Sequence, residues 1–417
     1  MVIFNAESNM KFVHIEDFFH PDAGYQLNLL SVSQVRQGHE VIIITSLLDK
    51  VPDSLTSFFS KENIKEKDQS FTKNTGVKII RLPIHKYYSG RAIFHRGFIK
   101  RIKIESPDVL FVHGNDTLTA MRILFNFKSI NLPIVMDSHM LEMATTNRFS
   151  AIFRIIYRNI FTPLIRKYKI PIIKIVDSDF IDKNYNIPFF LIKRSSFGTD
   201  SIHFSPNSQN KEVMRQKYNI NMDDFVVLYA GKMDESKGGL FLANAIKQKI
   251  ELNDRNIVFV IIGNTTKDDY GEMVESTFKS SENKIIRIPT QTYRNLSNFY
   301  QMADIAFFPK QCSMSYFEVQ SCGLPVVIEK NEINLERVSN EKGLLFNEGS
   351  IEDLTTAIVR FGNMEKKLFQ TFCNNSRENI VKNYNYENVA LEFTNIMKDK
   401  YNEFYSQTQL SKKTSKE

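Results

Sequence analysis

Short runs of apolar residues alternate with segments of helical periodicity along most of the chain. The runs are nearly continuous in Val, Ile, Leu and Phe, which is typical of parallel strands covered on both faces. In the first half the predicted strands are Lys11–Glu16, Val41–Thr45, Val77–Leu82, Val109–His113, Ile134–Asp137, Ile172–Val176 and Phe190–Lys193, with a helix over Gln26–Gln37. This order predicts βαβ units and a parallel sheet.

A second alternation follows a polar stretch at residues 207–211. Its predicted strands are Phe225–Tyr229, Ile257–Ile262, Ile285–Ile288, Ile305–Phe308 and Val326–Ile328. Its predicted helices are Gly239–Gln248, Gly271–Phe278, Arg294–Gln301, Tyr316–Cys322, Ile351–Phe361 and Tyr386–Phe404. We therefore expect an α/β protein with two Rossmann-like domains, 10–205 and 206–385, then a helix over 386–405 and a disordered polar tail over 406–417.

The positive charge of the chain lies in its first half. Residues 1–200 carry 27 Lys and Arg against 19 Asp and Glu, whereas residues 201–417 carry 27 against 28. Segment 143–176 has no carboxylate, and its basic and apolar residues alternate at partly helical spacing. Such a segment favours binding to an anionic membrane surface, although its apolar face could instead pack in the domain core. Because no recognition motif accompanies the charge, we expect no nucleic-acid partner.

The three cysteines, Cys312, Cys322 and Cys373, predict reduced thiols rather than a disulfide framework or a zinc site. The first residues lack a secretory signal, and the apolar runs are far too short to span a membrane. We therefore expect a cytoplasmic protein, peripheral on the inner face of the membrane if the basic segment binds lipid.

The loop after the predicted strand Phe225–Tyr229 is the first candidate for chemistry. Gly231 is followed by Lys232 and Lys237, and a Gly-Gly pair then opens a helix. Ammonium groups and free N–H groups at a helix start favour a phosphate. An exposed charged loop is the alternative. A second loop glycine, Gly263, follows the next strand and allows close approach of a ligand, or forms a plain turn.

A helix expected to begin near Ser315 is the second candidate. Its first-turn amides suit a diphosphate, and Glu318 suits the two hydroxyls of a ribose. Ser315 and Glu318 also have the spacing of a capping box, which would only stabilise the helix.

In the first half, Gly24 precedes a helix, and His113 and His139 end predicted strands. A histidine at a strand end is commonly structural, but two on one sheet edge make a cleft position plausible for His139. No spacing of His, Asp or Cys typical of a metal site occurs, so we expect none.

Five motifs in order resemble those of family 4 glycosyltransferases. They are MKFVHIEDFFHPDAGYQ at the start, SFGTDSIHFSP at the junction, GKMDESKGG, ADIAFFP with SYFEVQSCGLPVV, and GLLFNEGSIEDLTTAI. The resemblance implies a GT-B fold, in which two Rossmann-like domains face each other across a cleft and the last helix crosses back to the first domain. It also implies a retaining transferase that moves a sugar from a UDP- or GDP-type donor to a polysaccharide or lipid-linked oligosaccharide, with no metal or cofactor.

The resemblance gives each candidate residue a role. Lys232 and Lys237 would neutralise the leaving diphosphate, with Gly231 and Gly263 in the donor-binding loops. Glu318 would bind the ribose, and Gly24 and His139 would lie beside the transferred sugar. The backbone of Met314, Ser315 and Tyr316 would lie under the phosphates.

The chain departs from the family pattern at one place. The family has a glutamate eight positions before the residue that matches Glu318, and this chain has Lys310 there. That glutamate normally contacts the donor sugar. Two alternatives therefore accompany glycosyl transfer: a GT-B nucleotide-sugar epimerase, or a non-catalytic partner subunit that keeps the fold.

Overall fold

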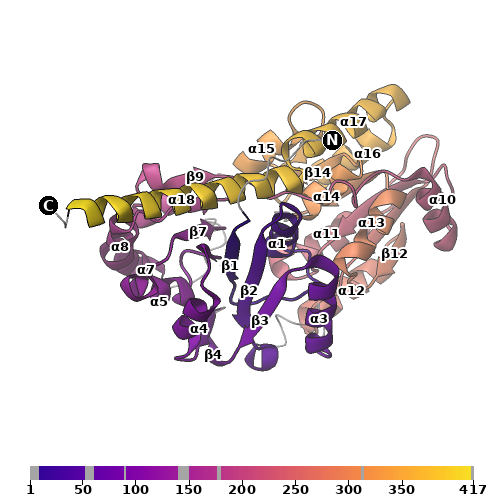
Figure 1. The fold of residues 1–417 in the computed structure, drawn as a ribbon. Helices are drawn as coiled ribbons and strands as arrows, with labels where there is room; N and C mark the ends of the chain where they lie inside the picture. The colour runs from indigo at the N-terminus through magenta and orange to yellow at the C-terminus, as the bar shows by residue number, and fades with distance from the viewer. Residues whose placement is uncertain are drawn as a thin grey trace. The chain divides into compact units, whose positions relative to one another are not determined.

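The computed structural model describes residues 9–51, 61–88, 91–139, 150–175, 180–310 and 314–414. The chain forms two compact units. The first unit runs to Phe197 and includes the chain from Glu387 onward, and the second unit comprises Gly198–Tyr386 (Figure 1).

The first unit is built on a parallel sheet of seven strands in the order β3-β2-β1-β6-β7-β8-β9. Its strands are β1 (Lys11–Ile15), β2 (Glu40–Ser46), β3 (Lys78–Leu82), β6 (Val109–Val112), β7 (Ile134–Ser138), β8 (Ile172–Lys174) and β9 (Ile192–Arg194). The central strands are buried, as their continuous apolar sequences predict.

Helices and one hairpin complete the first unit. They are α1 (Gln26–Arg36), η1 (Leu48–Lys50), α3 (Ile64–Thr75), the hairpin β4 (Ile84–Tyr88) and β5 (Arg91–Phe94), α4 (Phe98–Glu105), α5 (Leu118–Phe125), α6 (Phe127–Ile130), α7 (Ser150–Ile156), the π-helical turn η3 (Tyr157–Phe161), α8 (Thr162–Lys167), α9 (Phe180–Tyr185), η4 (Phe189–Leu191) and α18 (Tyr386–Thr414).

The second unit is built on a parallel sheet of six strands in the order β12-β11-β10-β13-β14-β15. Its strands are β10 (Phe225–Ala230), β11 (Ile257–Ile262), β12 (Lys284–Ile288), β13 (Ile305–Phe308), β14 (Val326–Glu329) and β15 (Gly343–Phe346). Its helices are α10 (Ser208–Lys217), η5 (Glu235–Lys237), α11 (Gly239–Ala245), α12 (Asp269–Lys279), α13 (Tyr293–Met302), α14 (Ser315–Ser321), α15 (Glu332–Val338), α16 (Ile351–Gly362) and α17 (Lys366–Asn383).

Each sheet has one point where the strand order reverses. In the first sheet β1 lies between β2 and β6, and in the second β10 lies between β11 and β13. Open α/β sheets bind ligands in the crevice beyond the carboxyl ends of the two strands at such a point. The topology therefore directs attention to the loops after β1 and β6, and to those after β10 and β13.

The two predicted Rossmann-like sheets are confirmed, but the sequence missed several elements. The β4–β5 hairpin is antiparallel and lies outside the main sheet, and α17 was not predicted. Helix α18 continues past residue 405 to Thr414, into the segment for which the sequence predicts a disordered tail. Extending an existing helix avoids the unfavourable nucleation step, so a polar sequence suffices there. Residues 415–417 lie outside the described residues.

The helix α18 packs on the first unit. Its buried residues include Val389, Phe393 and Met397, and the Phe393 ring lies 5.9 Å from that of Phe111 on β6. The buried Lys400 ammonium donates to the carbonyl oxygens of Tyr168 at 3.3 Å and Lys169 at 2.7 Å. Through these contacts, the chain from Glu387 onward forms part of the first unit.

The basic segment 143–176 forms a helical stretch over α7, η3 and α8 and then strand β8. Its residues 143–149 and 176 lie outside the described residues. One side packs in the core through Tyr157, Phe161 and Ile165. Large apolar residues also remain exposed: Ile152 (59%), Ile155 (58%), Ile156 and Ile160. The segment therefore has both a core face and an exposed apolar face.

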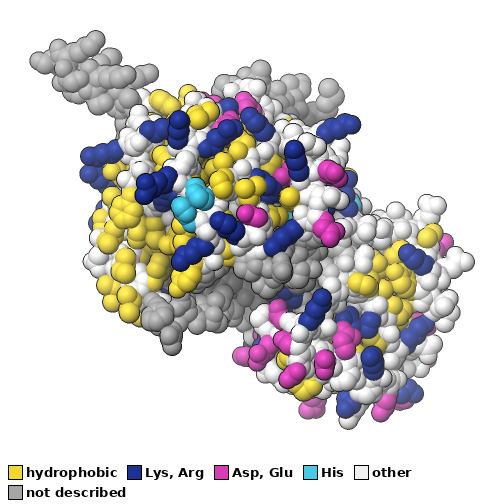
Figure 2. All heavy atoms as spheres, turned by 90° about the horizontal axis from the view of Figure 1, so that it is seen from below, with side chains coloured by type: hydrophobic (Ala, Val, Ile, Leu, Met, Phe, Trp, Pro, Cys, Tyr) yellow, Lys and Arg dark blue, Asp and Glu magenta, His cyan; other side chains and the backbone are white. Residues whose placement is uncertain are grey.

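Basic and apolar side chains are mixed elsewhere on the molecule too. Figure 2 shows a face on which hydrophobic side chains lie among many Lys and Arg side chains. Phe125 and Ile104, on α5 and α4, are among the most exposed apolar residues of the first unit, at 63% and 60%. Among the described residues, no helix is long and apolar enough to cross a bilayer.

A buried ion pair ties α10 to the edge of β13 in the second unit. Arg215 is 1% exposed, and its guanidinium donates to Asp304 Oδ2 at 2.9 Å and to the carbonyl oxygens of Met302 and Asp224. The same carboxylate accepts the N–H of Val226 on β10 at 2.8 Å. The pair therefore joins a helix to the two strands at the switch point.

We predict that Asp304→Ala lowers the free energy of unfolding by about 3–5 kcal/mol, because it leaves the Arg215 guanidinium buried without its carboxylate. Urea unfolding followed by circular dichroism measures the change. The control is Glu251→Ala, which removes an exposed ion pair with Lys249 (3.2 Å) and costs at most about 1 kcal/mol. Equal losses for the two variants would contradict the assigned role.

Candidate functional site

The loop after β10 brings the two predicted lysines close together. The Asp234 carboxylate caps the short helix η5 by accepting the N–H of Lys237 at 3.0 Å, and Gly238 follows with a φ of +71°. Burial lowers the pKa of Lys232, and the charge of Lys237 adds to this effect against the opposing charge of Asp234. A tight turn thus holds two ammonium groups beside the switch point of the second sheet.

The glycines of this edge pack against each other. Gly263 has a φ of +134°, and a Cβ there would lie 1.8 Å from the carbonyl oxygen of Gly231. The N–H of Gly231 in turn donates to Ile262 at 3.0 Å. The close approach that Gly263 permits is therefore made by the protein's own backbone.

Lys310, the residue at the family's glutamate position, lies against the same loop. It follows β13, and its Cγ would lie 3.2 Å from a Cβ at Gly238. Burial and the charge of Glu348 raise the pKa of Glu329 at the end of β14, while the Lys310 charge opposes them. The substitution therefore places a lysine side chain against the turn at Gly238, and its charge acts on Glu329.

Glu318 lies in the first turn of α14 and is 3% exposed. It accepts a hydrogen bond from the Tyr300 hydroxyl at 2.9 Å, and burial raises its pKa to about 7 against the effect of that bond. Met314 is the residue before the helix, and no side chain caps it. The capping-box interpretation of Ser315 and Glu318 is therefore wrong, because Ser315 is already inside the helix.

The Tyr316 side chain is part of the core. It is 1% exposed, and its hydroxyl donates to the carbonyl oxygen of Arg337 at 2.8 Å. Of Tyr316, only the backbone therefore stays a candidate for phosphate binding.

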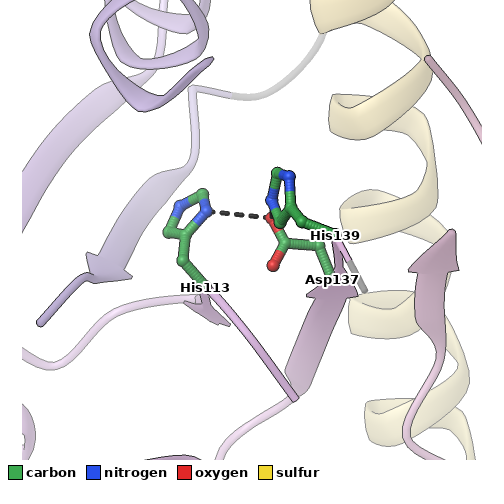
Figure 3. A group of neighbouring side chains, drawn as sticks. All are labelled: His113, Asp137 and His139. Atoms are coloured by element: carbon green, nitrogen blue, oxygen red, sulfur yellow. Dashed lines mark hydrogen bonds and ion pairs between the residues drawn. The ribbon is translucent and has the colours of Figure 1, made fainter. Parts of the chain in front are cut away.

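In the first unit, the two histidines at predicted strand ends both lie within hydrogen-bond distance of the Asp137 carboxylate. Asp137 Oδ2 lies 3.0 Å from His113 Nδ1 and 3.2 Å from His139 Nε2 (Figure 3). Asp137 is fully buried and His113 nearly so, whereas the His139 side chain is 37% exposed. Sequence reasoning missed Asp137, although its place two residues before His139 on β7 was a usable signal.

Electrostatics favour an ionised Asp137. Burial acts to raise its pKa, but the charges of His139 and His113 and their hydrogen bonds outweigh burial and hold the pKa well below its usual range. The N–H of Gly114 also donates to the other carboxylate oxygen at 2.6 Å.

Two further carboxylates end β1 at the same sheet edge. Asp17 accepts the Thr119 hydroxyl at 2.5 Å and the N–H of Ala92 at 3.0 Å. Burial and the charges of Asp17 and Asp137 raise the pKa of Glu16 to about 8. Gly24 lies half-buried in the same loop after β1, just before α1. Sequence reasoning missed both carboxylates.

Among the described residues, His113, Asp137 and His139 form the one group of at least three His, Cys, Asp or Glu side chains close enough to share a metal ion, with ligand atoms within 4.8 Å of one another. Both rings already bond to a single carboxylate oxygen. The independence from metal that the resemblance implies stays a prediction.

Comparison with known proteins connects this geometry to a family. Residues 210–383 match the family model described as "Glycosyl transferases group 1". This match covers nearly all of the second unit, including the loop with Lys232 and Lys237 and the helix with Glu318. The second unit is therefore similar to the group 1 glycosyltransferases over residues 210–383.

Two curated relatives agree with this similarity. A lipopolysaccharide 1,2-N-acetylglucosaminetransferase of Salmonella typhimurium is 27% identical over 45% of this chain. An Escherichia coli UDP-Gal:alpha-D-GlcNAc-diphosphoundecaprenol alpha-1,3-galactosyltransferase is 26% identical over 45% of this chain. The matched regions span 51% and 49% of the relatives' own lengths, so the chain matches about half of each.

Solved structures show the fold over the whole chain. A glycosyltransferase from Rickettsia africae has a TM-score of 0.72 at 15% identity, covering 94% of this chain and 99% of its own. The Anabaena protein HepE, solved with UDP and glucose, has a TM-score of 0.68 at 15% identity, covering 94% and 100%. The predicted GT-B fold is thereby confirmed.

The raised pKa of Glu318 predicts how stability depends on pH. Since the folded protein holds this proton up to about pH 7 and an unfolded carboxyl releases it lower, the stabilisation is lost as pH rises through about 7. Relative to Glu318→Gln, the wild-type free energy of unfolding should fall by about 3 kcal/mol between pH 5 and 8, an order-of-magnitude figure. Urea unfolding at both pH values tests this, and parallel pH profiles would refute it.

Proposed function

We propose that the chain is a glycosyltransferase that moves a sugar from a nucleoside-diphosphate sugar to a polysaccharide or lipid-linked oligosaccharide. The observation that carries the proposal is the pair of ammonium groups, Lys232 and Lys237, beside the switch point of a group 1 glycosyltransferase unit. Cations fixed where the leaving diphosphate gains charge lower the barrier to transfer. The names of both curated relatives, which describe sugar transfer, support this reaction class.

The comparisons favour UDP over GDP as the nucleotide of the donor sugar. One relative's name includes UDP-Gal, and one structure with the same fold was solved with UDP. In this proposal the transfer is retaining, as in family 4, and needs no metal, because Lys232 and Lys237 supply the positive charge that a metal would otherwise bring.

The remaining site residues take roles consistent with their positions. Glu318 binds the ribose hydroxyls, and the backbone at Met314, Ser315 and Tyr316 receives the phosphates. Gly231 and Gly263 hold the donor loops in shape. His139 and Gly24, both after strand ends of the first sheet, lie beside the transferred sugar.

Lys310 is the reason to consider that the chain is a non-catalytic partner subunit. A non-catalytic partner subunit would tolerate the loss of the sugar-binding glutamate, whereas the lysine pair after β10 favours an enzyme. Binding of UDP or GDP in a thermal-shift panel separates them, since the partner subunit would bind neither. A third possibility, a nucleotide-sugar epimerase, would form product from the donor alone.

We also propose that the first unit binds an anionic membrane surface. The described part of segment 143–176 exposes Ile152, Ile155, Ile156 and Ile160, and it carries basic residues with no carboxylate. Exposed apolar side chains that insert between headgroups and cations that pair with anionic lipid act together in such binding. Binding of the first unit to such a surface places the enzyme beside a lipid-linked acceptor.

Lys237→Ala should lower donor turnover about a hundred-fold or more, because it removes a charge that stabilises the leaving diphosphate. Release of nucleoside diphosphate from UDP-sugars, with lipid-linked acceptor present, measures turnover. Lys249→Ala, an exposed lysine on the same unit, should behave as wild type. Turnover of the Lys237 variant within a few-fold of wild type would show that the assigned role is wrong.

The double variant Ile152→Ser with Ile155→Ser should lose most of the binding to vesicles that contain anionic lipid, measured by co-sedimentation. The matched control is Val213→Ser with Met222→Ser, two equally exposed apolar residues of the second unit (57% and 53%). Equal binding of wild type to anionic and neutral vesicles would remove the membrane proposal.

A further inference from the structure

Two histidines stack on the surface of the first unit, at the end of the β4–β5 hairpin where its two strands begin and end. His85 lies on β4 and His95 directly follows β5. Their ring centroids lie 3.8 Å apart, with an angle of 28° between the ring planes. His85 is exposed and His95 is half-buried, and Figure 2 shows exposed histidine side chains among Lys and Arg side chains. These two histidines are not part of the candidate site described above.

Two cationic side chains are fixed at the same end of the hairpin, one on each strand. The Lys50 ammonium, from η1, donates to the carbonyl oxygen of Ile84 at 2.9 Å. The Arg122 guanidinium, from α5, donates to the carbonyl oxygen of Phe94 at 2.6 Å. Ile84 and Phe94 are paired across the hairpin, so both charges are held beside one residue pair. An ammonium has three N–H donors and a guanidinium has five, so both groups keep donors for a further ligand.

The charges that surround His85 are mainly positive. Desolvation of the ring, which lies against another imidazole, lowers the pKa of His85, and the charges of four basic neighbours lower it further. These neighbours are His95, Lys50, Arg122 and Arg96. One carboxylate, the exposed Asp49, also lies on η1. Because like charges repel, this arrangement costs free energy that a bound anion would recover.

A phosphate group is the anion that these donors suit. A guanidinium binds phosphate oxygens through two parallel hydrogen bonds, and an ammonium binds them as a point charge. Protonated imidazoles donate as well. A metal ion is the other common ligand of paired histidines, but the charges of Lys50, Arg96 and Arg122 would repel it.

We propose that the first unit has a phosphate-binding site formed by five basic side chains: Lys50, His85, His95, Arg96 and Arg122. The phosphate belongs either to an anionic lipid headgroup or to a soluble phosphate ester, since both present the same oxygens. This site uses none of the residues assigned to sugar transfer and none of segment 143–176, so it stands or falls independently of both proposals.

The hairpin connects the phosphate site to the edge of the first sheet. At the start of β5, the N–H of Ala92 donates to Asp17 Oδ2 at 3.0 Å. Three residue steps separate Ala92 from His95, which is about 10 Å along an extended strand. A lipid phosphate bound at the site would therefore hold the carboxylates that end β1 close to the membrane surface.

Binding should strengthen as pH falls. The lowered pKa of His85 keeps its ring neutral near pH 7 in the free site. A bound phosphate favours the protonated ring, so binding takes up protons, and by linkage protons favour binding. For a ligand of constant charge, the affinity should therefore be higher at pH 5.5 than at pH 8.

Co-sedimentation of the full-length protein with vesicles of phosphatidylcholine and phosphatidylglycerol tests the lipid source. The phosphodiester of phosphatidylglycerol keeps its charge over this pH range. His85→Gln with Arg96→Gln, two exposed positions, should weaken binding at pH 5.5 by about ten-fold or more and reduce its rise at low pH. The control Lys65→Gln with Lys73→Gln removes two exposed cations from α3 of the same unit and should keep the pH dependence.

Inorganic phosphate tests the soluble source. NMR of the full-length protein labelled at its eight histidines follows the ring signals, with His85 and His95 assigned by their loss in the single Gln variants. At constant pH and ionic strength, phosphate should shift both signals in wild type and in the Lys65 and Lys73 control. It should leave the ring of His203, on the second unit, unchanged.

The two probes together decide the proposal. Vesicle binding that depends on His85 and Arg96 supports the site with a lipid headgroup as its ligand. Phosphate-induced ring shifts, with equal vesicle binding by variant and control, support the site with a soluble ester as its ligand. The proposal is overturned if phosphate shifts neither ring and the His85 and Arg96 variant binds vesicles as the control does at both pH values.

Discussion

Parallel strand pairing is the constraint on which the candidate site depends. Because all strands of a parallel sheet point the same way, their carboxyl ends share one edge, and the reversal of strand order leaves a crevice there. In the second unit the loops after β10, β11 and β13 bring Lys232, Gly263 and Lys310 to this edge. In the first unit the same geometry unites β1, β6 and β7 around Asp137.

The two units use different electrostatics at equivalent places. The second unit collects cations, and a donor diphosphate is the ligand that such a cluster suits. The first unit collects carboxylates and histidines, whose raised and lowered pKa values arise from burial and mutual charge. Such groups suit the hydroxyls of a sugar better than an anion.

Local patterns predicted the fold and the loops, whereas contacts through space escaped prediction. The strands could be predicted because strands buried on both faces have continuous apolar sequences. Lys232 and Lys237 could be predicted because they lie in one short loop. Asp137 and His14 lie 123 residues apart, and both contact His113. No local sequence pattern indicates these contacts. The β4–β5 hairpin was missed because its strands are only five and four residues long and each contains basic residues, His85 and Lys86 in β4 and Arg91 in β5.

The central claim is that the second unit holds a nucleoside diphosphate at the edge formed after β10 and β13. A crystal structure of the full chain with UDP tests this most directly. We expect the diphosphate within hydrogen-bond distance of Lys232 and Lys237, with the ribose hydroxyls on Glu318. UDP bound away from these three side chains, or no UDP at saturating concentration, would contradict it.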